Sequence, residues 1–164
     1  MKKVFSARVA KIPFTKQGYE KILQQKVELL GQRPAAVENL RKAREMGDLS
    51  ENGYYKAARA KLSFLDAQLR RLERLIRFGA VVESTGSEKV EIGSRVVFTD
   101  GRKNYEYTVV GSYESDPSKQ TISYISPIGK ALLGKKEHDN VQIHAPAGTV
   151  SYTILKIIVP GAMN

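Results

Sequence analysis

Two carboxylates three residues apart, Asp48 and Glu51, lie in the short polar segment MGDLSENGYY, residues 46–55. Side chains at this spacing at the start of a helix can point the same way. Carboxylate oxygens suit Mg²⁺, which proteins commonly hold through one or two carboxylates together with water and phosphate. Two carboxylates are too few to hold the ion stably, so this pair would complete a metal site that another molecule supplies.

The same pair could serve only to start a helix. Asp48 as the N-cap and Glu51 as the third helical residue form the D-x-x-E pattern of a capping box. Alternatively, Ser50 is the cap and Glu51 is stabilised in the first turn by the helix dipole. The local sequence leaves capping and metal binding open, and one pair of residues can do both.

Cations surround this segment on both sides. Residues 1–78 contain 18 Lys and Arg against 8 Asp and Glu, a net charge of +10, whereas residues 79–164 contain 9 of each. Such an asymmetry suggests that the first half meets a polyanion or an acidic surface. Cations beside the carboxylates would suit a nucleic-acid backbone, and a merely solvated basic helical face is the simpler alternative.

Two helices would position the carboxylates. Residues 51–77 carry an apolar seam with alternating spacings of three and four, which is typical of a coiled coil. The seam consists of Tyr55, Ala58, Leu62, Leu65, Leu69, Leu72 and Ile76.

An earlier segment supplies the predicted partner helix. Gly31–Pro34 predicts a local break, with Pro34 in the first turn of a resumed helix. Residues 46–50 allow only a tight reversal, so residues 16–77 are predicted to form an antiparallel helical hairpin with the carboxylates at its tip. The face predicted to pack on the second helix consists of Tyr19, Leu23, Val27, Leu30, Val37 and Leu40.

After Phe78 the apolar pattern changes to every second residue, which is typical of strands. Val96–Thr99 and Tyr105–Val110 flank a turn that opens with Asp100–Gly101, and this arrangement predicts a β-hairpin. Further short strands are expected near residues 122–124, 141–143 and 150–154, after a loop or linker at residues 84–91.

One short helix is expected among these strands, in SPIGKALLG at residues 126–134. Ser126 fits the N-cap, Pro127 the first helical position and Gly134 the C-terminal cap. The second half is therefore predicted to be an α+β domain with a mainly antiparallel sheet.

Several kinds of chemistry are excluded. The sequence has no Cys and no GxxxxGK[ST] phosphate-binding loop, and His138 and His144 are too few and too isolated for a typical zinc site. No apolar run approaches the ~20 residues needed to span a bilayer. A soluble, cytoplasmic protein without membrane contact is expected.

Four stretches resemble the Gre transcript-cleavage factors of bacterial RNA polymerase. The resemblance spans residues 12–158 in the family's order and spacing, and the motif of the tip is specific. It implies two domains: a coiled-coil hairpin at residues 1–78, with its acidic tip near residues 46–52, and an FKBP-like domain at residues 79–164. The four stretches are IPFTKQGYEKIL, AREMGDLSENGYYKAAR, ISYISPIGKALLG and APAGTVSYTILKI.

The resemblance also implies a function. Such factors insert the hairpin into the secondary channel of the polymerase, where the tip carboxylates help to hold a Mg²⁺ at the polymerase's own active site and position a water. The polymerase then hydrolyses backtracked RNA, so the factor is a cofactor and not itself an enzyme. By motif position the carboxylates are Asp48 and Glu51, and a monomer is expected.

Other residues take their expected roles from the same resemblance. Arg44, Arg59 and Lys61 are candidates for guiding the 3′ end of the nascent RNA, with Tyr54 and Tyr55 as further channel contacts. Ile125, Ser126 and Pro127 are expected to dock on the rim of the channel. Solvated or intrahelical charges are the alternative for the three cations.

Two departures from the family pattern stand out. The family commonly has Ala and an acidic residue before the tip tyrosine, where this chain has Gly53 and Tyr54. Tyr54 could stack on an RNA base or pack on the opposing helix. An Asp often precedes Ser-Pro in the family, and here that place is Ile125, so an apolar contact could replace a polar one.

Three other functions are alternatives to this one. A homologue of the Gre factors could occupy the channel and inhibit the polymerase, although the intact DLSEN motif argues against this. A prolyl isomerase or chaperone would need a concave, aromatic-lined apolar site, for which the second half offers only Phe98 as Phe and no Trp. A general nucleic-acid binder would bind free RNA as tightly as it binds polymerase.

Overall fold

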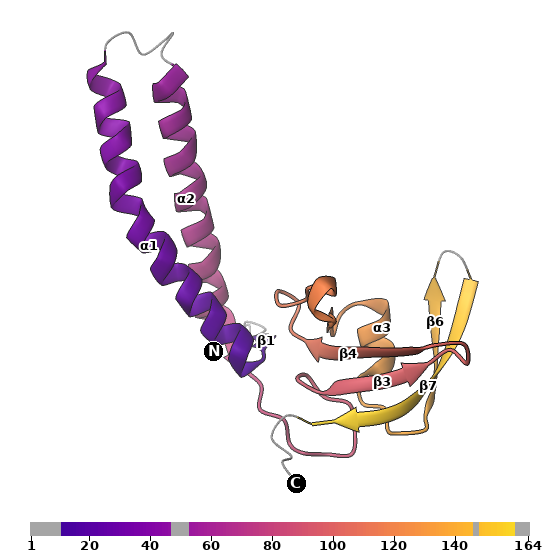
Figure 1. Cartoon of the computed structure of the whole chain (residues 1–164). Helices are drawn as coiled ribbons and strands as arrows, with labels where there is room; N and C mark the ends of the chain where they lie inside the picture. Colours follow the sequence, from indigo (N-terminus) through magenta and orange to yellow (C-terminus); the bar gives the residue numbers. More distant parts are fainter. Residues whose placement is uncertain (1–10, 47–52, 146–147, 160–164) are drawn as a thin grey trace, which may run out of the picture. The chain divides into compact units, whose positions relative to one another are not determined.

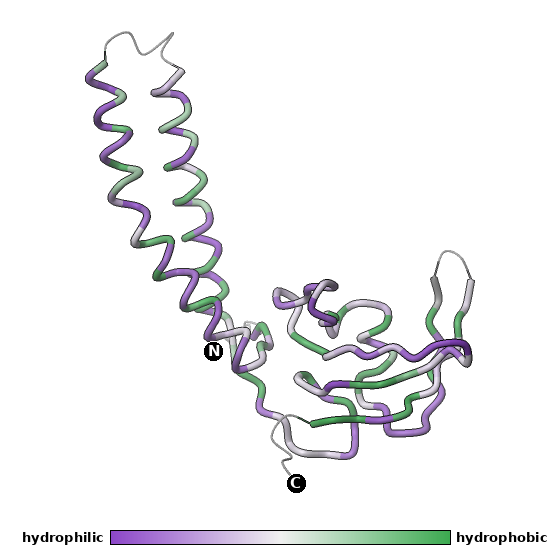
Figure 2. Tube along the Cα trace, viewed as in Figure 1, coloured by the Kyte–Doolittle hydropathy of each residue, from purple (hydrophilic) through white to green (hydrophobic). Residues whose placement is uncertain are grey.

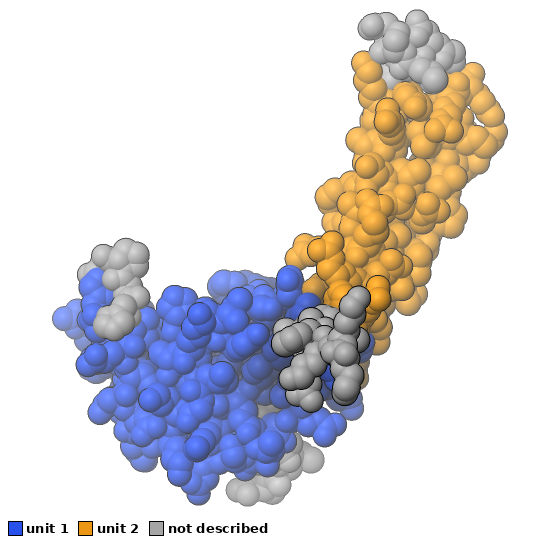
Figure 3. Space-filling view, turned by 180° about the vertical axis from the view of Figure 1, so that it is seen from behind, with its two compact units in different colours: residues 1–19, 79–164 blue, residues 20–78 orange. Residues whose placement is uncertain are grey.

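The structure, a computed structural model, describes residues 11–46, 53–145 and 148–159. The chain divides into two compact units, drawn in separate colours in Figure 3. Residues 20–78 form the helical unit, and residues 1–19 together with residues 79–164 form the second unit. Apolar positions recur along the helices and the strands of both units (Figure 2).

The helical unit is a hairpin of α1 (Lys16–Glu45) and α2 (Gly53–Phe78), shown in Figure 1. Two ion pairs join the helices, from Lys26 to Glu73 at 3.5 Å and from Arg33 to Asp66 at 2.8 Å. A later residue of α1 thus pairs with an earlier residue of α2, so the helices run antiparallel. This confirms the predicted hairpin.

The predicted seam of α2 is confirmed for most of its length. Ala58, Leu65, Leu69 and Leu72 are buried, and Leu65 and Leu69 form one apolar cluster with Ala36 of α1. At the end of the helix Leu75 is buried, whereas Ile76 is only half-buried.

The predicted face of α1 is wrong at four of its six positions, and only Tyr19 and Leu40 are half-buried. Leu23, Val27, Leu30 and Val37 are 40%, 69%, 46% and 41% exposed, while the buried residues of α1 are Ile22, Ala36 and Ala43. The face towards α2 includes Lys26 and Arg33, whose charged ends pair with carboxylates of α2. Long cationic side chains can cover apolar surface with their stems, so Lys26 and Arg33 occupy positions of the packed face that the apolar pattern did not identify.

The predicted break at Gly31–Pro34 is also absent, because α1 is continuous through Pro34. Proline has no N–H, so the Leu30 carbonyl lacks its usual donor four residues later. Leu30 and Pro34 are both exposed, and water can therefore replace the missing donor.

This assignment of the two faces of the hairpin is testable by truncation. We expect Leu65→Ala to lower the free energy of unfolding of the hairpin by about 2 kcal/mol, because it opens a cavity in the seam. Val27→Ala should change it by less than about 0.5 kcal/mol, because that side chain is largely exposed. Urea unfolding followed by far-ultraviolet circular dichroism measures both, and equal losses would contradict the assignment.

The second unit contains a five-stranded sheet in the order β5-β4-β3-β7-β6 (Figure 1). All neighbouring pairs are antiparallel except β4 and β5, which are parallel, so the sheet is mixed but mainly antiparallel. The predicted hairpin around Asp100–Gly101 is confirmed as β3–β4. The elements are β3 (Arg95–Thr99), β4 (Asn104–Val110), β5 (Thr121–Ser123), β6 (Asn140–Ala145), β7 (Gly148–Ile158), α3 (Pro127–Leu132) and the 3₁₀ helix η1 (Pro117–Lys119).

The core of this unit lies between the sheet and α3. Leu132 of α3 is fully buried against strand residues that alternate along β3, β4 and β7. Tyr105, Tyr107 and Tyr152 pack around Phe98, with ring centroids 5.3–6.1 Å apart. The buried residues of the cluster are Val90, Val96, Phe98, Val109, Leu132, Val141 and Ile154.

The predicted domain boundary at residue 78 assigned residues 1–19 to the hairpin domain, whereas they belong to the second unit. A short strand, β1 (Ile12–Phe14), pairs in parallel with β2 (Gly79–Val81), and Phe14 is fully buried with its ring 6.4 Å from that of Tyr113. The next backbone N–H, of Thr15, donates to Glu114 over 2.9 Å. The strand pairing joins residues 12–14 to residues 79–81, and the contact of Thr15 with Glu114 joins residues 99 apart, so no local pattern shows them.

The loop at residues 84–91 is organised around the half-buried carboxylate of Glu91. Hydroxyl groups of Ser84 and Ser87 donate to it over 2.9 and 3.0 Å, and Thr85 donates through both its hydroxyl and its backbone N–H. The hydrogen bonds from Thr85, with those from the two serines, lower the pKa of Glu91 to about 2.

The lowered pKa of Glu91 predicts a pH dependence of stability. Because the pKa is lower in the folded chain, the carboxylate stabilises the fold fully above its ordinary pKa of 4.5, and this contribution is lost as the pH falls through about 2. We expect Glu91→Gln to reduce the stability of the second unit near neutral pH and to flatten its loss on acidification. Thermal unfolding across this pH range measures the effect, and parallel curves for parent and variant would contradict it.

Candidate functional site: the hairpin tip and an apolar pocket

The carboxylates Asp48 and Glu51 lie outside the described residues, between the end of α1 at Glu45 and the start of α2 at Gly53. These two helix ends lie together at one end of the hairpin (Figure 1). The chemistry of the two carboxylates fits Mg²⁺. Among the described residues no group of three or more His, Cys, Asp or Glu could hold a metal ion.

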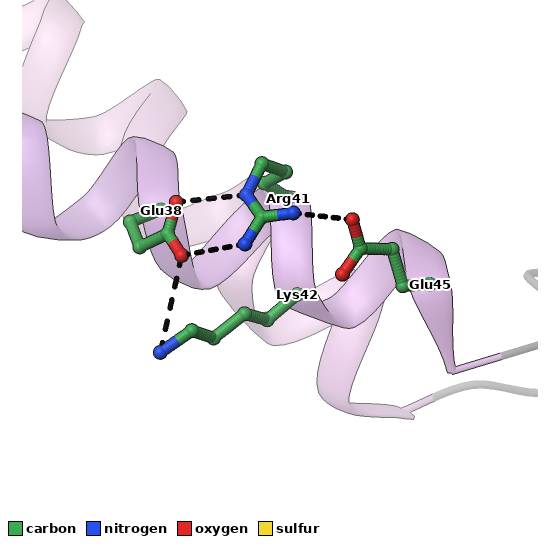
Figure 4. Close-up of polar contacts among 4 residues, drawn as sticks. All are labelled: Glu38, Arg41, Lys42 and Glu45. Carbon is green, nitrogen blue, oxygen red and sulfur yellow. Dashed lines mark hydrogen bonds and ion pairs between the residues drawn. The ribbon is translucent and has the colours of Figure 1, made fainter.

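The cations near the tip differ in whether a described carboxylate balances their charge. Arg41 donates to the carboxylates of Glu38 and Glu45, and Lys42 lies 3.9 Å from Glu38 (Figure 4). The hydrogen bond from Arg41 lowers the pKa of Glu38 below its ordinary value. The positive charge of Arg41 is therefore balanced within α1.

The three cations predicted to guide RNA lack such a carboxylate among the described residues. Arg44 of α1 and Arg59 and Lys61 of α2 are exposed, and none forms an ion pair with another described residue. Within the part of the chain that the structure describes, no carboxylate balances their charges, whereas Glu38 and Glu45 balance the charge of Arg41.

The two tyrosines occupy the first turn of α2. Tyr54 is 47% exposed, and Tyr55 is half-buried. Tyr54 is thus not buried against the opposing helix, which was one of the two expectations for it.

The residues expected to dock on the polymerase surround the start of α3. Ser126 is the N-cap as predicted: its Oγ accepts from the backbone N–H of Gly129 over 3.0 Å and donates to the Ser123 carbonyl over 2.7 Å. Pro127 occupies the first helical position, and Gly134 follows the helix with a positive φ of 76°. Ile125 is 50% exposed and Pro127 is exposed, so both present apolar surface beside a capped helix.

A pocket of about 450 Å³, which no pattern of the sequence predicted, lies next to this motif. Its walls come from five separate segments, so only the strand pairing and the placement of α3 bring them together. Tyr152 is its one aromatic lining residue, which leaves it poorer in aromatic rings than an isomerase site would require. The pocket is lined by Ser115, Pro117, Thr121, Ile122, Ser123, Ser126, Pro127, Ile128, Ile143, Val150 and Tyr152.

Comparison with known proteins shows to which family a chain with this helical hairpin and small α+β domain belongs. The family described as "Transcription elongation factor, GreA/GreB, C-term" matches residues 76–158, and "Transcription elongation factor, N-terminal" matches residues 12–81. No helix among the described residues is long and apolar enough to cross a membrane. The chain belongs to the GreA/GreB family of transcription elongation factors.

Named relatives cover nearly the whole chain. Transcription elongation factor GreA of Maridesulfovibrio salexigens is 41% identical over 93% of this chain and 98% of its own length. GreA of Nitratiruptor sp. is 38% identical over 90% of this chain and 93% of its own length. Among solved structures, GreA factor homolog 1 (Gfh1) of Thermus thermophilus is 26% identical over 90% of this chain and 99% of its own, with a TM-score of 0.44.

Proposed function

We propose that this chain inserts its hairpin into the secondary channel of bacterial RNA polymerase and stimulates Mg²⁺-dependent hydrolysis of backtracked RNA. The observation that carries the proposal is the antiparallel hairpin, which brings the ends of α1 and α2 together on either side of the DLSEN motif. A protein of this kind acts in the cytoplasm and rescues arrested transcription complexes.

The chemistry belongs to the polymerase, and this chain completes it. Asp48 and Glu51 would contribute carboxylate oxygens to a Mg²⁺ at the polymerase active site and orient a water towards the RNA phosphate. The ion supplies the Lewis acidity that stabilises the attacking and leaving oxygens in two-metal phosphodiester cleavage. The chain is in this sense a cofactor and not an enzyme.

The exposed cations near the tip are suited to binding the phosphates of the RNA. Arg44, Arg59 and Lys61 would contact phosphates of the extruded 3′ end, because exposed cations that no described carboxylate balances can bind phosphates with release of counterions. Arg41 is a poorer candidate, since Glu38 and Glu45 already balance its charge.

The second unit would dock on the rim of the channel. Ile125 and Pro127 are exposed apolar residues, and Ser126 fixes the start of α3 between them. With the pocket lined by Ser126 and Pro127, they offer a concave apolar surface to a partner.

The test is the addition of the purified protein to backtracked elongation complexes with labelled RNA and Mg²⁺. Release of 3′ fragments followed by resumed elongation is expected. Binding to the complexes with inhibited elongation and no fragments would instead identify a homologue that occupies the channel and regulates the polymerase.

A further inference from the structure

The exposed apolar residues of α1 form a continuous row beside the face that packs on α2. They follow one another at alternating spacings of four and three, so they lie together along one side of the helix. From residue 23 to residue 37 the row is about 21 Å long at 1.5 Å per residue. We call it the α1 strip, and it consists of Leu23, Val27, Leu30, Pro34 and Val37.

The α1 strip has the pattern of a helix-packing seam but carries no helix. Its four branched aliphatic side chains are between 40% and 69% exposed. The second helix packs instead on the neighbouring row of α1, which contains Leu29 and Ala36. A groove of about 520 Å³ lies over the strip, and its walls are Leu30, Arg33, Pro34, Val37 and Glu38.

Two residues at the middle of the strip weaken α1 without a reason inside the hairpin. Gly31 costs up to about 1 kcal/mol of helix stability relative to Ala, although a Cβ there would meet no atom within 4 Å. Pro34 leaves the carbonyl of Leu30 without its usual donor, and both residues are exposed. A glycine allows another backbone to approach closely, so this part of α1 suits a helix that packs on it from outside.

The ion pairs between the helices show which flank of α2 borders the strip. Lys26 and Arg33 stand four residues before and three residues after Leu30, so they adjoin it on the surface of α1. Their charged ends reach Glu73 and Asp66 of α2 at 3.5 and 2.8 Å. The flank of α2 with these two carboxylates therefore lies on the same side of the hairpin as the strip, and both carboxylates are already balanced.

Two further cations on this flank of α2 are not balanced by a described carboxylate. Arg70 lies four residues after Asp66, and Arg77 lies four residues after Glu73, so each shares a helix face with the earlier carboxylate. Both arginines are exposed and neither forms an ion pair in the part of the chain that the structure describes. The apolar strip is thus bordered by two positive charges seven residues apart.

We infer that the α1 strip binds an amphipathic helix of another protein, whose apolar row meets the strip and whose carboxylates meet Arg70 and Arg77. Such a helix would complete a bundle of three helices with α1 and α2. Charge favours an acidic partner over a second copy of this chain, because residues 1–78 carry a net charge of +10 and two hairpins would repel each other. The surface uses no residue of the tip or of the pocket beside α3, so the inference does not rest on the proposed function.

The first experiment uses a synthetic helix as the probe. A fluorescein-labelled peptide about three heptads long carries Leu at positions a and d and Glu at positions e and g, where the like charges keep it monomeric. We expect saturable binding to the full chain, measured by fluorescence anisotropy. A peptide with Lys in place of every Glu should bind at least about tenfold more weakly. No binding, or equal binding of the two peptides, would overturn the inference.

A charge placed in the strip tests whether the peptide binds there. Val27→Glu should weaken binding of the acidic peptide at least about tenfold, because it puts a like charge into the apolar contact. Phe64→Glu is the matched control, since Phe64 is 67% exposed where Val27 is 69% exposed. Leu65 is buried towards α1, so Phe64 and Asp66 lie on opposite flanks of α2, and Phe64→Glu should bind as the parent does. Unchanged circular dichroism shows that each variant is folded, and equal losses in the two variants would overturn the inference.

Reversing the charges of the border tests the choice of partner. With Arg70→Glu and Arg77→Glu combined, the chain should bind the Lys peptide more tightly than the Glu peptide, which inverts the preference of the parent. Arg71→Glu is the control, because Arg71 lies seven residues after Phe64 and so on the opposite flank, and it should keep the parent's preference. A preference that the double variant leaves unchanged would overturn the assignment of the two arginines.

Two further measurements test other occupants of the strip. Sedimentation equilibrium of the parent should show a monomer, and a dimer that Val27→Glu abolishes would show that a second copy covers the strip and overturn the inference. A Val27→Glu variant that loses affinity for polymerase but binds the acidic peptide as the parent does would identify a polymerase contact and also overturn it. Peptide binding is measured without polymerase, so a failure to stimulate cleavage would leave this inference standing.

Discussion

Asp48→Asn should bind RNA polymerase normally and yet lose most stimulation of cleavage, by about 10²-fold. That is the order of loss when groups that support a bound metal are removed. Asn keeps the size and much of the hydrogen bonding of Asp but removes the negative charge that attracts Mg²⁺. Asn is also a good N-cap, so the hairpin should keep its stability.

The metal dependence of the variant adds a second readout. Raising Mg²⁺ should partly restore cleavage, because a weakened site fills at a higher metal concentration. The variant should also compete with the parent protein, since it binds without stimulating. The measurement is the cleavage rate of a purified backtracked complex at saturating protein across a series of Mg²⁺ concentrations. A fully active Asp48→Asn with unchanged metal dependence would leave this residue as a helix cap only.

The pattern of the sequence predicted the hairpin because the apolar residues of α2 recur at alternating spacings of three and four. Its seam is apolar at almost every position that faces α1, so period and burial agree from Ala58 to Leu72. The N-cap at Ser126 and the β3–β4 hairpin were predictable for a similar reason, because both depend on residues close in sequence.

The face of α1 was not predictable in this way. Two positions of its face towards α2 are Lys26 and Arg33, which form ion pairs with Glu73 and Asp66 of α2. The exposed side meanwhile carries Leu23, Val27 and Leu30 at spacings that imitate a seam. A cross-helix ion pair depends on two helices together, and hydrophobic periodicity in one helix does not report it.

Contacts between distant segments explain the other differences. The pairing of β1 with β2 joins residues 12–14 to residues 79–81 and moves the start of the chain into the second unit. The pocket beside α3 likewise draws Ile143 and Val150 from strands that follow α3 in the sequence. The tip carboxylates themselves remain a prediction from the sequence, because they lie outside the described residues.

The second large effect is expected at the apolar surface beside α3. Ile125 is 50% exposed at a position where the family often has an acidic residue, so we expect it to make an apolar contact with the polymerase. Ile125→Lys would place a charge in that contact and leave it poorly solvated. We expect the concentration needed for half-maximal cleavage to rise about 50-fold, the scale of a central interface residue.

Matched variants decide whether this surface is the docking site. Val150→Lys charges an exposed residue that lines the pocket, and it should weaken docking as Ile125→Lys does. Ile158→Lys adds the same charge at an exposed apolar residue that does not line the pocket, and it should have little effect. In all three variants the cleavage rate at saturating protein should stay close to that of the parent, because the tip is unchanged. If Ile158→Lys weakens binding as much as Ile125→Lys does, added charge alone explains the loss, and the surface beside α3 is not the docking site.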